Sequence, residues 1–304
     1  MTTIAVIAHS GKSFGGGLGE LRQVLDDAGF GQPLWYEVAK SRQAPDCARE
    51  AMAAGADILF VWGGDGTVQR CIDAVADSDA TIAILPAGTA NLLASNLGIP
   101  QDIADAVEIG LHGDRRALDT GTVNGEHFAV MAGAGLDALM IKDADAGLKD
   151  RIGRAAYLWT GAKNLAASPV TATVDVEGRR FYKGTITCVL IGNVSHVLAG
   201  IEVFDGARPD DGLLEVGVVT AHSRVQWART VGRVALGRAQ KSPFVVTSRG
   251  SSVKVRFDKA TASELDGGVR KATRKLRIKV RPSSLTVCVP VPSPRTDAQD
   301  RAEA

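Results

Sequence analysis

Residues 60–70, FVWGGDGTVQR, join an apolar segment to a helical one through three glycines and an aspartate. Glycine tolerates positive φ angles and lets a ligand approach the bare backbone closely. The segment TVQRCIDAVA that follows has helical periodicity, so its free N–H groups and the positive end of the helix dipole face the turn. The pattern predicts an anion site, most often one for phosphate.

Asp65 distinguishes this turn from a simple dinucleotide-binding turn, which uses glycines alone. A carboxylate at this position would repel a phosphate unless a cation or a hydrogen-bond donor lies between the two groups. The turn therefore favours a nucleotide bound together with Mg²⁺. The alternative is a tight strand-to-helix turn in which Asp65 only caps the helix.

Two further polar turns follow predicted strands. Residues 8–12, AHSGK, contain Ser10, Gly11 and Lys12, and residues 85–91, LPAGTAN, contain Gly88, Thr89 and Asn91. In a parallel sheet the loops after the strands meet at the carboxyl edge, where ligands bind. We therefore expect the three loops to surround one nucleotide.

The rhythm of the chain changes at about residue 118. Residues 1–117 alternate short apolar runs with helical patterns, which predicts an α/β domain with a parallel sheet. Residues 118–283 alternate polar and apolar positions between Gly, Asn and Asp turns, which predicts an antiparallel, β-rich, sandwich-like domain. Helices are expected within 152–165 and 223–240, and the polar tail 293–304 is expected to be disordered.

Composition favours a cytoplasmic globular protein. The chain has 304 residues and is 45% hydrophobic, which is enough for two domains. No apolar run approaches the roughly 20 residues of a membrane span, and the first residues lack a signal-peptide pattern. The cysteines show neither disulfide nor zinc spacing, since they lie far apart at Cys47, Cys71, Cys188 and Cys288.

Charge is distributed unevenly along the chain. Residues 1–120 contain 8 basic and 16 acidic residues, whereas the remainder contains 27 and 18, and residues 216–257 contain eight basic residues and no acid. The predicted helix 223–240 could lie on an anionic membrane with Trp227 at the interface, or could pack its apolar face on its own sheet; the two alternatives stand equal. Nucleic acid is not expected, because no aromatic residues interleave with the basic ones. The sequence is compatible with a homodimer.

An ordered set of motifs resembles the diacylglycerol kinase catalytic family. The motifs are GGDGT, PAGTAN, LDTGTVN at 118–124, RPDDGLLEV at 208–216 and ELDGG at 264–268, and the resemblance runs from residue 4 to about residue 290. That family includes soluble bacterial lipid kinases and the sphingosine and ceramide kinases. The resemblance implies an N-terminal domain like that of NAD kinases and phosphofructokinases, ATP bound between the two domains, and completion of the first domain by residues 284–292.

The resemblance also assigns roles to individual residues. It implies that Asp266 is the catalytic base, and that Asp119 joins Asp65 and Lys12 in a hydrogen-bond network. It further implies a structural Mg²⁺ site near the lipid-binding cleft, formed by Asp211 and the backbone oxygens of Arg208 and Leu213. The implied ATP site consists of Ser10, Gly11, Lys12, Gly63, Gly64, Asp65, Gly66, Thr67, Gly88 and Thr89.

Several positions depart from the family pattern. Ala8 and His9 replace an Asn-Pro pair, Leu92 stands where an acid is common, and Gly268 replaces the glutamate that usually follows the catalytic Asp-Gly. The last change leaves Asp266 with one fewer neighbour to orient it. Taken without the other motifs, ELDGG would indicate only a hairpin turn.

The predicted function is an ATP-dependent, peripherally membrane-associated lipid kinase that phosphorylates diacylglycerol or a similar lipid. The lipid cleft is expected from segments 131–158 and 193–204. One alternative is a soluble-substrate kinase of the NAD kinase type, although LPAGTANLLA differs from the segment that NAD kinases carry. The other is a nucleotide- or lipid-binding regulator with impaired catalysis, suggested by Gly268.

Overall fold

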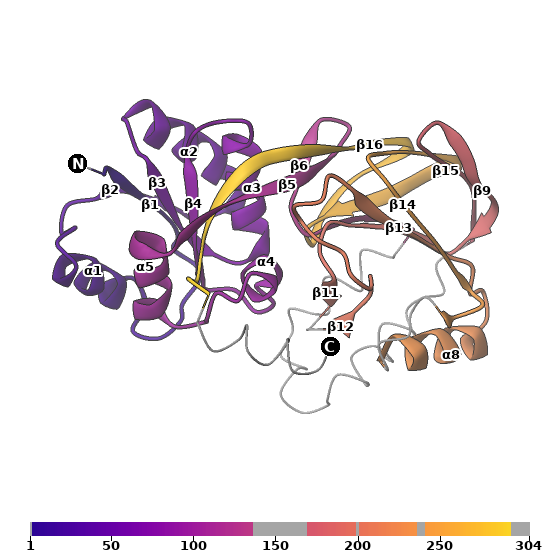
Figure 1. The fold of residues 1–304 in the computed structure, drawn as a ribbon, viewed down its shortest axis with the longest axis horizontal. Helices are drawn as coiled ribbons and strands as arrows, with labels where there is room; N and C mark the ends of the chain where they lie inside the picture. Colours follow the sequence, from indigo (N-terminus) through magenta and orange to yellow (C-terminus); the bar gives the residue numbers. More distant parts are fainter. Residues whose placement is uncertain (1, 136–168, 199–200, 236–240, 293–304) are drawn as a thin grey trace.

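The computed structural model describes residues 2–135, 169–198, 201–235 and 241–292. An α/β part formed by the N-terminal residues lies beside a β-rich part formed by the remainder (Figure 1). This arrangement confirms the predicted fold class. The expected helix at 152–165, the end of the expected helix 223–240 and the tail 293–304 lie outside the described residues.

A parallel sheet with the strand order β2-β1-β3-β4 forms the core of the first part. Every residue of β3 and β4 is buried, which explains why these strands are almost continuously apolar rather than alternating. The strands are β1 (Ile4–His9), β2 (Leu34–Val38), β3 (Ile58–Gly63) and β4 (Thr81–Pro86).

Helices pack on this sheet through apolar faces of helical period. In the last of them, α5 (Ile103–His112), the buried positions Ile103, Ala106, Val107 and Gly110 follow the i, i+3, i+4, i+7 pattern. Gly110 lets α5 approach the sheet, since a Cβ there would lie 2.6 Å from Cζ of Phe60. The other helical segments are α1 (Gly17–Asp27), the 3₁₀ turn η1 (Ser41–Gln43), α2 (Ala44–Ala53), α3 (Asp65–Val75) and α4 (Leu92–Asn96).

Antiparallel strands form the second part around a valine-rich core. Burial alternates at every second residue of β8 (Val170–Val176), as expected for a strand with one solvated face. Val174, Val216 and Val255, from three different strands, belong to the same buried cluster. The remaining strands are β5 (Asp114–Val123), β6 (Glu126–Phe128), β7 (Met131–Ala134), β9 (Arg179–Ile186), β10 (Cys188–Gly192), β11 (His196–Leu198), β12 (Ile201–Glu202), β13 (Leu214–Val219), β14 (Val245–Gly250) and β15 (Ser252–Leu265).

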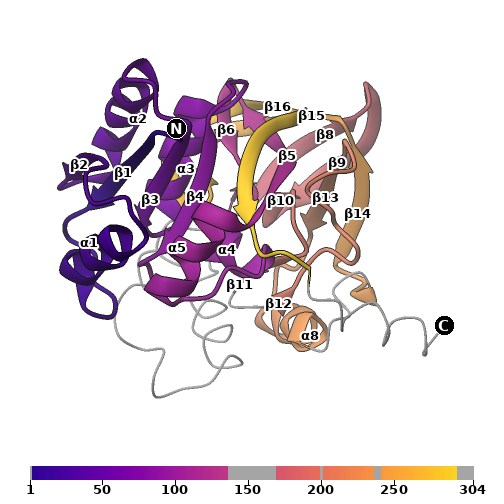
Figure 2. The same cartoon turned by 60° about the vertical axis from the view of Figure 1, so that its left-hand side comes forward.

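The long strand β16 (Gly268–Val289) joins the two parts. Its first half pairs antiparallel with β15, and much of its length pairs antiparallel with β5. Near its end, Thr286 and Val287 pair in parallel with Thr81 and Ile82 of β4. Figure 2 shows this yellow end of β16 beside β4. The end of the C-terminal strand therefore extends the parallel sheet of the first part.

The predicted basic helix is present as α8 (Arg224–Ala235). Trp227 does not lie at a solvent interface, as one interpretation of this helix required; it is only 9% exposed and packs with Cys188, Val219 and Ala221. Val225, by contrast, is 62% exposed. Among the described residues, no helix is both long enough and apolar enough to cross a membrane.

Candidate active site

The GGDGT turn lies between β3, which ends at Gly63, and α3, which begins at Asp65. A Cβ on Gly63 would lie 2.6 Å from Cβ of Thr67, so the turn closes tightly only with glycine there. A Cβ on Gly66 would meet no atom within 4 Å, so the first turn of α3 borders open space. An open helix N-terminus of this kind fits a phosphate group.

The GGDGT and PAGTAN loops lie against each other. A Cβ on Gly64 would lie 3.1 Å from Cα of Gly88, so the two backbones meet where neither residue has a side chain. Asp65 fastens the contact, because its Oδ1 accepts a hydrogen bond from the N–H of Leu92 at 2.5 Å. Asn91, at φ 47°, holds the second loop by accepting from the Gly88 N–H at 2.9 Å.

The loop after β1 lies at the same edge of the sheet. Ser10 donates its backbone N–H to the carbonyl of Val38 at 3.0 Å, and the carbonyl of Lys12 accepts from Nε1 of Trp62 at 3.1 Å. His9 is engaged within the loop, where its Nδ1 accepts from the N–H of Gly11. The carboxyl ends of β1, β3 and β4 thus carry the three loops that the sequence predicted would lie together.

Ser41 is a residue of this edge that sequence reasoning missed. It follows β2, and its hydroxyl lies 2.9 Å from the hydroxyl of Thr67. The contact orients a side chain of the GGDGT turn that is itself only 2% exposed. The only available signal was a polar residue shortly after a strand, which is too common to single out.

Asp266 occupies the turn between β15 and β16 at φ 44° and is 3% exposed. Its carboxylate accepts three backbone hydrogen bonds, from Ala129 at 2.8 Å, Val130 at 2.9 Å and Met131 at 2.8 Å. Burial raises the pKa of Asp266 to about 6, and the negative charge of Asp65 adds to the rise, while the three N–H groups act against it.

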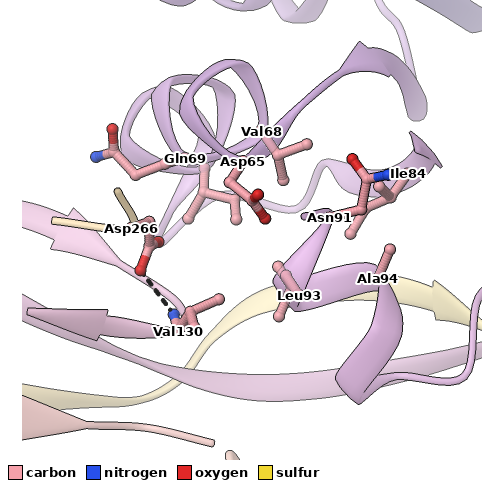
Figure 3. A pocket seen from close by; sticks show the side chains of 10 residues that line it. Asp65, Val68, Gln69, Ile84, Asn91, Leu93, Ala94, Val130 and Asp266 are labelled. Atoms are coloured by element: carbon pink, nitrogen blue, oxygen red, sulfur yellow. Dashed lines mark hydrogen bonds between the residues drawn. The ribbon is translucent and has the colours of Figure 1, made fainter. Parts of the chain in front are cut away.

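Asp65 and Asp266 line the same pocket from the two parts of the chain (Figure 3). Gln69, Asn91 and Val130 also contribute to its wall. Burial raises the pKa of Asp65 as well, against the N–H groups of residues 91–93. Two carboxyl groups with perturbed pKa values in one pocket indicate a site for proton transfer.

Asp119 has partners other than those the resemblance implied. Its Oδ2 accepts from the N–H of Gly212 at 2.6 Å and its Oδ1 from the N–H of Ser283 at 2.8 Å. Its hydrogen bonds within the described residues include neither Asp65 nor Lys12. Asp119 is 3% exposed and fastens the RPDDG loop to β16, so the geometry supports a positioning role.

The RPDDG loop offers a limited set of metal ligands. Oδ1 of Asp211 accepts from the N–H of Leu213 at 3.0 Å. The described residues contain no group of three or more His, Cys, Asp or Glu side chains that could hold a metal. A cation here would have one carboxylate, the backbone oxygens of Arg208 and Leu213, and water. An all-oxygen set with several waters suits Mg²⁺.

Glu264 is a second carboxyl group that sequence reasoning missed. It precedes Asp266 by two positions, is 7% exposed, and its Oε2 has no hydrogen-bond partner among the described residues. Burial raises its pKa to about 7, and the charge of Asp266 contributes. The signal in the sequence was the two-residue spacing of Glu264 and Asp266 in ELD, because alternate residues of a strand lie on the same face.

Comparisons with known proteins identify both parts of the chain. Residues 4–123 match the family described as "Diacylglycerol kinase catalytic domain", and residues 130–289 match "YegS C-terminal NAD kinase beta sandwich-like domain". A Pseudomonas fluorescens protein named "Probable lipid kinase YegS-like" is 32% identical over 264 residues, which cover 85% of this chain and 87% of that protein. This chain belongs to the diacylglycerol kinase catalytic-domain family.

Other relatives of this lipid kinase family agree with the assignment. The diacylglycerol kinase of Bacillus subtilis is 26% identical over 254 residues, covering 82% of this chain and 83% of that protein. A crystal structure of a putative diacylglycerol kinase from Bacillus anthracis has the same fold, with a TM-score of 0.80 at 23% identity, over 94% of this chain and 96% of that one. The predicted family, the fold class and the assignment as a lipid kinase are therefore confirmed, and kinase membership implies the use of ATP.

Proposed function

We propose that this family member transfers the γ-phosphoryl group of ATP to a hydroxyl group of diacylglycerol or a similar lipid, with Asp266 as general base. The observation that carries the proposal is the position of Asp266 in the pocket that Asp65 also lines. The names of the relatives support a lipid acceptor. The choice of diacylglycerol or a similar lipid, and the role of Asp266 as the base, are the parts that we propose for this chain.

The hydrogen bonds of Asp266 suit a base. An ionised carboxylate has about four lone-pair positions. Two N–H groups occupy Oδ1 and one occupies Oδ2, so one position remains on Oδ2. With a pKa of about 6, the group is ionised at neutral pH and still basic enough to accept a proton.

The reaction then has a simple balance. The lipid hydroxyl oxygen attacks the γ-phosphorus while its proton moves to Oδ2 of Asp266, and the bond from the γ-phosphorus to the bridging oxygen breaks to release ADP. Such transfers depend mainly on positioning and on stabilisation of charge. Gly64, Gly66 and Thr67 would hold the phosphates at the N-terminus of α3, with Lys12 supplying a cation. Mg²⁺ bound with the nucleotide would add positive charge against the phosphates, whereas an ion held by Asp211 at the RPDDG loop would have a structural role.

Peripheral membrane contact in the cytoplasm is part of the same proposal. With Trp227 buried, a membrane-facing α8 would present Arg229, Arg233 and the exposed side chain of Val225. Basic residues near an anionic bilayer contribute about 1 kcal/mol each.

Of the segments expected to line the lipid cleft, 136–158 lies outside the described residues. Phe204 is buried against Gly217, with 3.3 Å between its Cε1 and a Cβ built there.

The test is transfer of radiolabelled γ-phosphate from Mg·ATP to diacylglycerol, monoacylglycerol, sphingosine, ceramide and NAD⁺, each presented separately, with the lipids in mixed micelles. We expect a labelled lipid whose formation is lost in Asp266→Asn and retained in Asp258→Asn, which changes an exposed carboxylate on β15, the strand that leads into the Asp266 turn. Labelled NADP⁺ would instead support the NAD kinase alternative. ATP binding without any labelled product would support the impaired regulator.

A further inference from the structure

Arg270 follows the Asp266 turn by four residues and reaches back across it. Its Nε donates to both carboxylate oxygens of Glu126 on β6, at 2.9 and 2.8 Å, and its Nη2 donates to Oε1 of Gln69 on α3, at 3.1 Å. The side chain of Arg270 is 17% exposed. One guanidinium therefore joins three elements, β16, β6 and α3.

The partners of Arg270 are themselves held in place. Arg70 of α3 forms a second ion pair with Glu126 at 3.2 Å. Gln69 is 2% exposed and donates through Nε2 to the carbonyl of His127 at 2.7 Å. Burial alone would raise the pKa of Glu126, but hydrogen bonding and charge from Arg270 hold this pKa below its usual value.

This network borders the active site directly. Gln69 lines the pocket together with Asp65 and Asp266, one helical turn after Asp65 on α3. A bidentate bond from arginine to a carboxylate is directional as well as strong. A change at Arg270 therefore acts on the turn of Asp266 and on the helix of Asp65 together.

Gly268 explains why the guanidinium can follow this path. A Cβ on Gly268 would lie 2.6 Å from Nη1 of Arg270, which is closer than a real Cβ contact allows. The guanidinium therefore occupies space that a side chain at position 268 would need. This is the position at which the family resemblance leads one to expect glutamate.

We propose that Arg270 is a positioning residue for the general base. By binding Glu126 and Gln69, it holds the turn that carries Asp266 against the helix that carries Asp65. The inference rests on the proposed function, because it assumes that the two aspartates must face one reacting lipid and ATP.

The first test replaces Arg270 by glutamine and by lysine and measures kcat and the KM for ATP separately. We expect kcat to fall by roughly 10- to 100-fold in Arg270→Gln, because small misplacements of reacting groups have effects of this size. Lysine should restore only part of the rate, since it keeps the charge without the fork. The KM for ATP should change less than about threefold, because the glycine loops are untouched. Arg274→Gln, an exposed change on the same strand, is the matched control.

The second test introduces glutamate at position 268. Gly268→Glu should lower kcat, because its side chain displaces the guanidinium, and adding Arg270→Ala to it should lower kcat little further, because the network is already broken. A rise of kcat above that of the unmodified protein in Gly268→Glu would overturn the inference.

Glu126→Gln keeps the inference falsifiable if the Arg270 variants fold poorly. It breaks the same network from β6, and its effect on kcat should combine with Arg270→Gln less than additively. Full additivity, or unchanged kcat in folded Arg270→Gln, would remove Arg270 from this role. Such a result, with Asp266 still essential, would leave the proposed function intact, whereas turnover independent of Asp266 would contradict the proposed function itself.

Discussion

Asp65 and Asp266 line one pocket although Asp65 begins a helix of the parallel α/β part and Asp266 occupies a hairpin turn of the β-rich part. Each carboxyl group is fastened by backbone N–H groups of its own surroundings, Leu92 for Asp65 and residues 129–131 for Asp266. The distance between the two carboxyl groups therefore depends on how the two parts pack. Contacts across this boundary, such as that of Arg270 with Gln69, are consequently expected to affect turnover.

The pH dependence of turnover should report Asp266. A general base acts in its ionised form, so kcat should fall as the pH decreases through about 6, the raised pKa of this group. Below that value the rate should decline about tenfold per pH unit. The measurement is kcat with saturating Mg·ATP and lipid in mixed micelles between pH 5 and 8. A kcat that stays level down to pH 5 would show that burial does not perturb the essential group.

The stability of the Glu264→Gln variant, relative to that of the unmodified protein, should increase as the pH rises. The pKa of Glu264 is raised to about 7 in the folded state, so the folded state binds its proton more tightly than the unfolded chain does. That contribution is complete below the unfolded pKa and is lost as the pH rises through about 7. Glutamine does not ionise, so the variant does not lose stability in this way. Its Tm, relative to that of the unmodified protein, should therefore increase with pH.

The size of this effect has an upper limit of about 3–4 kcal/mol in the free energy of unfolding, because the pKa of Glu264 rises from 4.5 to about 7 and each pKa unit corresponds to roughly 1.4 kcal/mol. Glu215→Gln on β13 is a suitable comparison, because burial also raises the pKa of Glu215 but the side chain lies partly in solvent. Equal pH responses of the two variants would contradict a special environment for Glu264.

Asp119→Asn should loosen the RPDDG loop. The change removes the charge that accepts the N–H groups of Gly212 and Ser283, and we expect a loss of about 1–3 kcal/mol in the free energy of unfolding. Urea unfolding measures the loss, and faster hydrogen exchange of those two amides would locate it. Reduced ATP affinity at unchanged stability would instead place Asp119 in the nucleotide site.

Basic residues lie on elements at opposite sides of the second part, namely α8 at the bottom of Figure 1 and β16 at the top. On the outer face of β15 and β16, Lys254 lies directly opposite Arg277, and Arg256 opposite Lys275. Like charges in opposite positions are unfavourable, and Arg277 and its basic neighbours lower the pKa of Lys275. A flat bilayer cannot contact both sides at once.

The membrane contact can therefore be assigned to one side. Arg229→Glu with Arg233→Glu should weaken sedimentation with anionic phosphatidylserine vesicles, most strongly at low salt, because the α8 contact depends on charge. Arg277→Glu with Lys279→Glu makes the same change of charge on the opposite side and should bind like the unmodified protein. Loss of binding only in the second variant would move the contact to the outer face of β15 and β16.

Local physical rules made much of this protein predictable from its sequence. Apolar runs alternating with helical periods indicated β3, α3 and β4, because burial on both faces of a parallel sheet requires continuous apolar strands. Glycines at positions 64 and 88 indicated loops whose backbone a ligand can approach closely. The ordered motifs indicated the family, and GGDGT, PAGTAN and ELDGG lie at strand ends or turns where local chemistry restricts the residue.

Tertiary structure decided what these local rules could not. Trp227 looked equally suited to a membrane surface and to a core, and only the packing of α8 on Cys188 and Ala221 buries it. Asp119 acquires Gly212 and Ser283 as partners, and Arg270 acquires Glu126 and Gln69, across long separations in the chain. The periodicity of a segment determines which face is apolar, but the partner of a buried polar group depends on which distant backbone the fold brings within hydrogen-bonding distance.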